Sequence, residues 1–184
     1  MPSGVAAVAV FCGSRAGHDP RHAEAARALG HGLARAGLRV VYGGGKVGLM
    51  GILADAALAA GGSVTGVLPG GLFSREVAHP GLTEMRLVAS LAERKQVMFD
   101  LADAFVALGG GIGTIDELVE MMTWRQLGLH AKPVVAVDLG GFWQPFLAAL
   151  RHADASGFGD GLPSLVATVP DVPACLARLG AAGG

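Results

Sequence analysis

Short apolar runs that are typical of buried strands alternate with helical segments along the whole chain. The expected strands are Val5–Phe11, Arg39–Tyr42, Ser63–Leu68, Met85–Val88, Ala104–Leu108, Val134–Asp138 and Leu165–Val169. Because continuous apolar strands joined by helices indicate a parallel sheet covered on both faces, the pattern predicts a doubly wound α/β fold. We expect one domain over residues 1–179, with a mostly parallel sheet of about seven strands, and a frayed tail at 180–184.

Helical periodicity and capping residues predict a helix between most neighbouring strands. Asp19 followed by Pro20 is an N-cap and first-turn signal, and apolar residues then recur at helical spacing until Gly37. Further helices are expected at Leu49–Ala60, Leu91–Leu101, Ile115–Leu127, Trp143–Ala155 and Val172–Leu179.

The apolar content of the chain is 52% and its mean hydropathy is +0.50, so a membrane span must be considered. The longest uncharged stretch, residues 56–74, is interrupted by several glycines and by Pro69. A spanning helix needs about 20 mostly apolar residues without such breaks. The N-terminal segment also lacks the basic region of a signal peptide. We therefore expect a cytoplasmic protein without a membrane partner.

The net charge of −1 gives no basic excess of the kind that nucleic-acid binders usually show, so DNA and RNA are not expected partners. The chain has two cysteines, Cys12 and Cys175. Two cysteines suit a reducing compartment and exclude both a disulfide framework and a multi-cysteine zinc site.

The glycines cluster directly after predicted strands. The clusters fall at residues 13, 43–45 and 48, 70–71, 109–111 and 113, and 140–141. The carboxyl ends of the strands form the ligand crevice of an open α/β sheet, and glycine there lets the backbone approach a ligand closely. The clusters therefore predict a ligand of nucleotide or phosphate size, although some of these glycines are expected in tight turns of any such fold.

Gly43, Gly45 and Gly48 match the spacing of a dinucleotide-binding fingerprint, but the context argues against it. The next strand ends without the Asp or Glu that would hold an adenosine ribose. A Walker loop is excluded as well, because Val47 follows Lys46 where Ser or Thr is needed. We therefore expect neither NAD nor ATP turnover.

The segment 109–117 combines a glycine loop with a helix that is expected to open at Thr114. Backbone N–H groups and the positive end of a helix dipole favour an anion such as a phosphate monoester. Thr114 and Glu117 also spell the Thr-x-x-Glu of a capping box. The spacing alone leaves open whether Glu117 is a cap or a reactive carboxylate.

A second segment, residues 90–98, pairs another possible capping box, Ser90 with Glu93, with the adjacent cations Arg94 and Lys95. Neighbouring helical residues point about 100° apart, so Arg94 and Lys95 cannot both lie on one face. An adjacent pair of basic residues on a helix either lines the crevice or is exposed to solvent.

These segments resemble the LOG family of cytokinin riboside 5'-monophosphate phosphoribohydrolases, often labelled lysine decarboxylase-like. The family marker pairs an Arg-Lys helix with Pro-Gly-Gly-x-Gly-Thr-x-x-Glu, and residues 109–117 here read Gly-Gly-Gly-Ile-Gly-Thr-Ile-Asp-Glu. The likeness extends to residues 11–14, 42–45, 48–51 and 123–130, and so covers nearly the whole chain. Three positions depart from the family pattern. Gly109 stands where the family usually has proline, Ala92 stands where histidine is common, and Phe142 stands where tyrosine is frequent.

The resemblance implies a Rossmann-like fold and hydrolysis of the N-glycosidic bond of a purine nucleoside 5'-monophosphate, AMP or N6-prenyl-AMP, as in cytokinin activation. Arg94 and Glu117 match the catalytic pair. The positions that match substrate contacts are Glu76, Lys95, Gly110, Gly111, Gly113, Thr114 and Thr123. The resemblance also implies a homodimer, for which Met121, Met122 and Trp124 offer large apolar side chains. No metal or cofactor is required.

Other interpretations were weighed. A nucleotide-binding or sensing module without turnover is the main alternative, although a pure binder has little use for a carboxylate beside an anion. A pyridoxal phosphate-dependent lysine decarboxylase is not expected, because the chain is small and offers only Lys46, Lys95 and Lys132 for a Schiff base. Cys12 lacks an identifiable histidine partner for nucleophilic catalysis. His18 and His22 stand at helical i, i+4 spacing, which more often marks a solvated helix face than a metal site.

Overall fold

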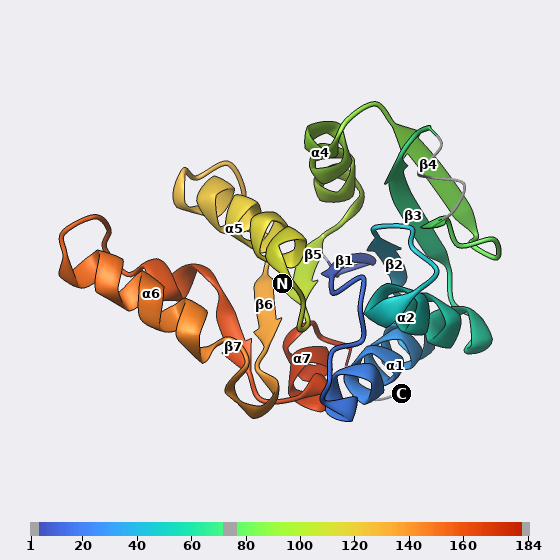
Figure 1. Ribbon diagram of the computed structural model, residues 1–184, viewed down its shortest axis with the longest axis horizontal. Helices are drawn as coiled ribbons and strands as arrows, with labels where there is room; N and C mark the ends of the chain where they lie inside the picture. The colour runs from blue at the N-terminus through green and yellow to red at the C-terminus, as the bar shows by residue number, and fades with distance from the viewer. Residues whose placement is uncertain (1–3, 72–76, 182–184) are drawn as a thin grey trace.

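The computed structural model describes residues 4–71 and 77–181. Its seven strands form one sheet in the order β4-β3-β2-β1-β5-β6-β7, and every neighbouring pair is parallel (Figure 1). The strands are β1 Ala7–Phe11, β2 Arg39–Tyr42, β3 Val64–Pro69, β4 Glu84–Val88, β5 Ala104–Ala107, β6 Val134–Val137 and β7 Ala167–Val169. The predicted doubly wound α/β fold is confirmed.

Helices cover both faces of the sheet. They are α1 Pro20–Arg35, α2 Gly48–Ala59, α4 Leu91–Leu101, α5 Ile112–Gln126, α6 Gln144–Ala155 and α7 Val172–Arg178. Residues from α1, α2 and α7 share one apolar cluster with the sheet, and residues from α4, α5 and α6 share the other. The central strands β1, β2 and β5 are buried on both faces, which explains why their sequences are apolar without alternation. Among the described residues no helix has the length and apolar character needed to cross a membrane.

The strand order reverses between β1 and β5, because β1 connects onward to β2 on one side while β5 lies on its other side. In open α/β sheets this reversal point, at the carboxyl ends of the strands, is where ligands bind. The loops that leave β1 and β5 are joined by a hydrogen bond from the Gly13 N–H to the Gly109 carbonyl, 3.0 Å long. Two of the predicted glycine loops are thus brought together at the expected place.

Several element bounds differ from those predicted, each for a local reason. The first strand begins at Ala7 and not at Val5, because the Asp103 carboxylate accepts hydrogen bonds from the N–H groups of Ala6 and Ala7 at 2.9 and 3.0 Å. The last strand begins at Ala167, because a 3-10 helix over Leu162–Leu165, with a proline in its first turn, occupies the start of the predicted run.

Candidate active site

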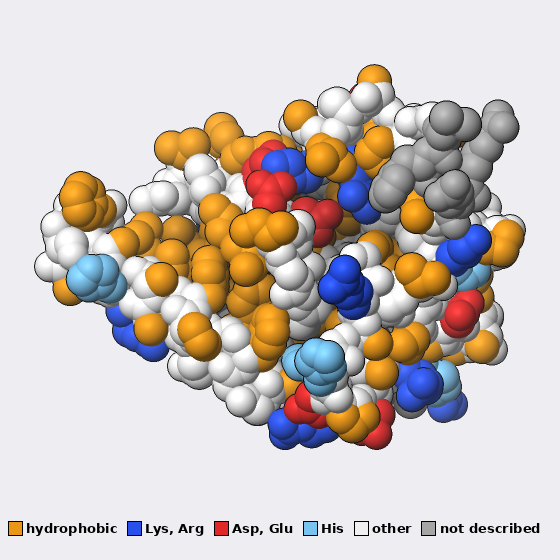
Figure 2. All heavy atoms as spheres, in the orientation of Figure 1, with side chains coloured by type: hydrophobic (Ala, Val, Ile, Leu, Met, Phe, Trp, Pro, Cys, Tyr) orange, Lys and Arg blue, Asp and Glu red, His pale blue; other side chains and the backbone are white. Residues whose placement is uncertain are grey.

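A cavity of about 1000 Å³ opens at the carboxyl ends of the central strands. Its wall includes the glycine loops after β1, β2 and β5 and the first turns of α4 and α5. Figure 2 shows acidic and basic side chains side by side where α4 and α5 approach each other, next to this hollow. The volume is at the upper end of the range typical of small-ligand sites, so a nucleotide fits.

The N-terminus of α5 forms the anion-binding end of the cavity. The helix begins at Ile112, two residues before the predicted Thr114, and its N-cap Gly111 makes no side-chain cap. The N–H groups of the first turn therefore have neither an intrahelical nor a side-chain acceptor. A Cβ atom at Gly111 or Gly113 would meet nothing within 4 Å, so a ligand can approach this backbone closely. Free N–H groups and the helix dipole together favour a phosphate here.

Thr114 anchors the glycine loop against the start of the helix. Its side chain is 4% exposed, and a Cβ atom at Gly110 would lie 2.0 Å from the Thr114 hydroxyl oxygen. Only glycine at position 110 therefore allows this packing. Both residues line the cavity.

Glu117 lies in the second turn of α5, partly open to the cavity, and makes no hydrogen bond to the described residues. Because α5 begins at Ile112, Glu117 is too far along the helix to cap it, and the capping-box interpretation is wrong. Burial raises the pKa of Glu117 to about 7, which Arg94 and Lys95 oppose and Asp116 reinforces. A carboxyl with this pKa changes its protonation state near neutrality, as acid-base catalysis needs.

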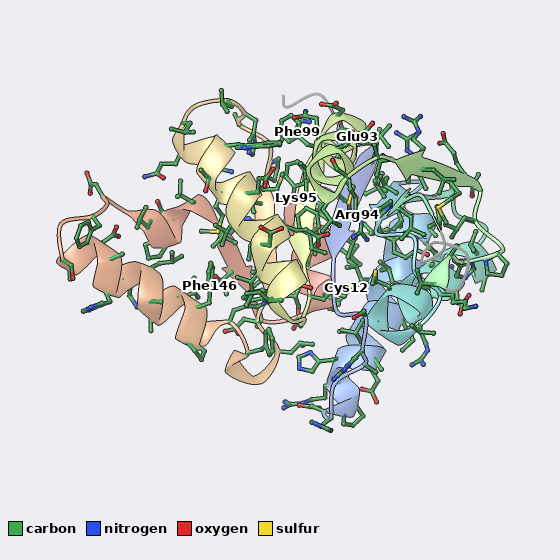
Figure 3. The ribbon with its side chains drawn as sticks, turned by 45° about the horizontal axis from the view of Figure 1, so that its top comes forward. Cys12, Glu93, Arg94, Lys95, Phe99 and Phe146 are labelled. Atoms are coloured by element: carbon green, nitrogen blue, oxygen red, sulfur yellow. The ribbon has the colours of Figure 1, made fainter. Side chains whose placement is uncertain are left out.

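In the other predicted capping box the hydrogen bond to the Ser90 side chain is confirmed, and it fixes the start of α4. The Ser90 hydroxyl accepts a hydrogen bond from the Glu93 N–H at 3.1 Å, while the Glu93 carboxylate accepts one from the Ala89 N–H at 2.6 Å. This cap sets the helical phase of the next two residues, Arg94 and Lys95. Their side chains consequently leave the helix in different directions (Figure 3).

Arg94 lines the cavity with its guanidinium held by two backbone carbonyls. Nε donates to the Val67 carbonyl at 2.9 Å, and Nη2 donates to the Gly43 carbonyl at 2.8 Å. A Cβ atom at Gly43 would lie 2.0 Å from Nη2. Glycine at position 43, in the loop after β2, is therefore required for this position of the Arg94 guanidinium.

Lys95 points instead toward α5. Its ammonium pairs with Asp116 at 2.9 Å and with Glu120, and these carboxylates raise the pKa of Lys95 against the opposing effect of burial. Lys95 is not part of the cavity wall. In this chain it joins the two helices that carry Arg94 and Glu117.

The predicted site residues fall into three groups. One group shares the cavity wall: Arg94, Gly110, Gly111, Gly113, Thr114 and Glu117. Lys95 and Thr123 lie outside it, and the Thr123 hydroxyl donates to the Val119 carbonyl at 2.8 Å within α5. Glu76 lies outside the residues that the structure describes.

The loop after β1 and the first turn of α1 contribute cavity-lining side chains that the sequence analysis did not assign to the site. Arg15, His18 and His22 line the cavity. The interpretation of the two histidines as a solvated helix face is wrong, because α1 begins only at Pro20 and His18 precedes it. Gly109, which departs from the family's proline, allows this arrangement, since a Cβ atom there would lie 2.7 Å from Nδ1 of His22.

Cys12, at the end of β1, closes the floor of the cavity. It is buried, and burial, aided by the nearby Glu117, raises the pKa of its thiol far above the usual range. A thiol in this state is a poor nucleophile, which agrees with the expectation from the sequence.

Comparisons with known proteins identify the family of the chain. A family model described as "Possible lysine decarboxylase" matches residues 50–176. A cytokinin riboside 5'-monophosphate phosphoribohydrolase from Rhodococcoides fascians is 46% identical over 152 residues, covering 82% of this chain and 77% of that protein. The chain belongs to the LOG family. Another LOG relative, from Arabidopsis thaliana, is 43% identical over 151 residues, covering 82% of this chain and 70% of the relative.

Solved structures show the same fold. A molybdenum cofactor (Moco) carrier protein from Chlamydomonas reinhardtii aligns with a TM-score of 0.71 and 24% identity, over 95% of this chain and 94% of that protein. A molybdenum cofactor binding protein from Rippkaea orientalis aligns with a TM-score of 0.71 and 20% identity, over 98% and 97%. At these identities the likeness concerns the fold alone.

Proposed function

We propose that this LOG-family chain hydrolyses the N-glycosidic bond of adenine nucleoside 5'-monophosphates, AMP or its N6-modified forms, to the free base and ribose 5-phosphate. The observation that carries the proposal is that the wall of one cavity contains a largely buried carboxyl, Glu117, a fixed cation, Arg94, and an open helix N-terminus. The relatives named as phosphoribohydrolases support the same reaction class.

In the proposed mechanism the first turn of α5 binds the 5'-phosphate and sets the position of the ribose. Arg94, held by the Val67 and Gly43 carbonyls, contributes a fixed positive charge to the ribose phosphate. As the bond from C1' to the base nitrogen breaks, the sugar becomes oxocarbenium-like, and the Glu117 carboxylate stabilises it. Glu117 also takes a proton from the water that adds to C1', and the departing base gains one proton from solvent or Glu117.

A binding module without turnover is less well supported. A site built only to hold a phosphate gains nothing from a buried carboxylate near it, because the two negative charges repel. Glu117 makes no hydrogen bond to the described residues that would give it a structural role. Its retention in the cavity therefore favours catalysis.

A pyridoxal phosphate-dependent decarboxylase does not fit the cavity. None of the cavity-lining residues that the structure describes is a lysine. Lys95 is paired with Asp116 and Glu120, and Lys132 donates to the Phe99 carbonyl at 2.7 Å on the far side of α4. In the part of the chain that the structure describes, no lysine is thus placed in the cavity wall to form a Schiff base.

We also propose a homodimer, but we expect other residues than those predicted to form its interface. Met121 and Met122 are 1% and 3% exposed and fill the core, and Trp124 packs against Phe99 with ring centroids 5.0 Å apart. The exposed apolar residues of α5 and the segment after it are Ile112, Val119, Leu127 and Leu129. These offer the apolar surface for a second copy.

A cytoplasmic location is proposed from the two free, buried cysteines.

The proposal is tested by chromatographic assay of base release from AMP, isopentenyladenosine monophosphate, GMP, CMP and adenosine. We expect release from the two adenine nucleotides and little from adenosine, since adenosine lacks the phosphate that the α5 N-terminus binds. Nucleotide binding by calorimetry without any base release would instead support the binding module.

A further inference from the structure

His22 lies on the cavity wall where the glycine loop leads into α5. It belongs to the first turn of α1 and lines the cavity. A Cβ atom at Gly109 would lie 2.7 Å from Nδ1 of His22 and 2.8 Å from Cε1. The imidazole ring therefore sits directly on the backbone of the loop that ends at the anion-binding turn.

A third loop holds the ring in place. Phe142, which follows β6, packs edge-on against His22 with ring centroids 5.3 Å apart and an interplanar angle of 78°. Helix α1 and the loops after β5 and β6 thus meet at this one side chain. Contacts on two sides restrict the rotation of the ring, so little side-chain entropy remains to be lost when a ligand binds.

The two ring nitrogens have different surroundings. Nδ1 is enclosed and has no hydrogen-bond partner among the described residues. Because enclosed N–H donors without acceptors are rarer than enclosed acceptors without donors, we assign the proton of the neutral ring to Nε2. Nε2 is not enclosed and makes no hydrogen bond to the described residues. The ring thus offers one N–H to whatever occupies the cavity.

The charges around His22 favour an anionic partner for that N–H. Arg15 and His18 also line this side of the cavity. The Asp19 carboxylate also lines the cavity, but it is engaged by Arg21 through a 2.6 Å ion pair and accepts a hydrogen bond from the Arg21 backbone N–H at 3.0 Å. That carboxylate caps α1 and does not neutralise the pocket.

We infer that His22 recognises the phosphate group of the ligand, its Nε2 donating to a phosphate oxygen that the first turn of α5 also binds. The inference rests on the proposed function in one respect, namely that the substrate is a phosphate monoester. It makes His22 a specificity-determining residue for phosphorylated over unphosphorylated nucleosides.

The test compares His22→Phe with the parent and with His31→Phe, an exposed position on the same helix α1 outside the cavity wall. Phenylalanine keeps an aromatic ring against Phe142 and removes both nitrogens. Titration calorimetry with AMP, ribose 5-phosphate, inorganic phosphate and adenosine should show the three phosphate ligands weakened about 10- to 100-fold in His22→Phe, as for loss of a hydrogen bond to a charged group. Adenosine binding should change less than about threefold, and His31→Phe should match the parent.

A measurement on the parent protein does not depend on any variant folding. In a nitrogen-15 NMR spectrum of the histidine rings, the Nε2 signal of His22 should shift on addition of ribose 5-phosphate and not on addition of adenosine. The inference is overturned if that signal is unmoved, or if His22→Phe weakens adenosine and ribose 5-phosphate equally. If AMP is not hydrolysed but the phosphate ligands still depend on His22, the proposed function fails and this inference stands.

Discussion

Replacement of Glu117 by glutamine should lower turnover by about 10² to 10⁴ and, above neutral pH, stabilise the folded protein. Burial raises the pKa of Glu117 from an ordinary value near 4.5 to about 7 in the folded protein. Between these values the folded chain still holds a proton that the unfolded chain has released. The free energy of unfolding therefore falls as the pH rises through this window, and the full loss is reached above pH 7.

The size of the loss follows from the difference between the two pKa values. Each pH unit between the two pKa values lowers the free energy of unfolding by about 1.36 kcal/mol, so the loss reaches about 3 kcal/mol above pH 7. This is an upper value, because Glu117 lines a cavity that water can enter. Glutamine is nearly isosteric with glutamate and carries no charge, so the free energy of unfolding of Glu117→Gln does not fall over this pH range. The variant should be close to the parent in stability near pH 4.5 and more stable by up to about 3 kcal/mol at pH 8.

Urea unfolding of the parent and Glu117→Gln at pH 5 and pH 8 measures this difference, with adenine release from AMP measured in parallel. We expect the stability gain to grow with pH while activity falls by about 10² to 10⁴, the usual range for loss of an acid-base group. A variant that is destabilised equally at both pH values would refute the assigned environment of Glu117. Activity within a few-fold of the parent would refute its assigned role.

Three further predictions concern the surroundings of Glu117. Gly43→Ala should lower kcat/KM for AMP at least tenfold in a folded protein, because the new Cβ would lie 2.0 Å from Nη2 of Arg94; unchanged kinetics would show that Arg94 need not occupy this seat. The kcat/KM for AMP should rise with pH and level off above about 7, because the Glu117 carboxylate is the working form, and a profile that falls over this range would assign the protonated acid instead. Lys95→Met should lower the free energy of unfolding by about 1 kcal/mol through loss of its ion pairs, with kcat/KM changed only a few-fold; a loss beyond tenfold would return Lys95 to the substrate site.

The fold was predictable because its signals are local and repeated. Apolar strands, glycine at strand ends and caps such as Asp19 and Ser90 each specify a short segment, and parallel pairing follows from the helices between strands. The predicted start of α5 was wrong because threonine, the residue at position 114, is a preferred N-cap residue. The structure instead uses Gly111, which a helix also accepts as an N-cap and which leaves its N–H groups open to a ligand.

What the sequence could not supply is side-chain direction and long-range contact. Arg94 and Lys95 are neighbours in the chain, yet Arg94 lines the cavity and is held by two backbone carbonyls, whereas Lys95 pairs with two carboxylates on α5. Met122 was expected on the surface and lies in the core, because the burial of a helix face depends on the neighbouring elements. His22 was assigned to a solvated helix face because its partners, Gly109 and Phe142, are far from it in sequence.

The central claim is that the cavity hydrolyses the bond between base and sugar while leaving the phosphate in place. Combined proton and phosphorus NMR of AMP incubated with the protein tests it directly. The account predicts adenine and ribose 5-phosphate in equal amounts, with neither adenosine nor inorganic phosphate formed, and no reaction in Glu117→Gln. Formation of adenosine and inorganic phosphate, or AMP that remains intact in the presence of the parent protein, would contradict it.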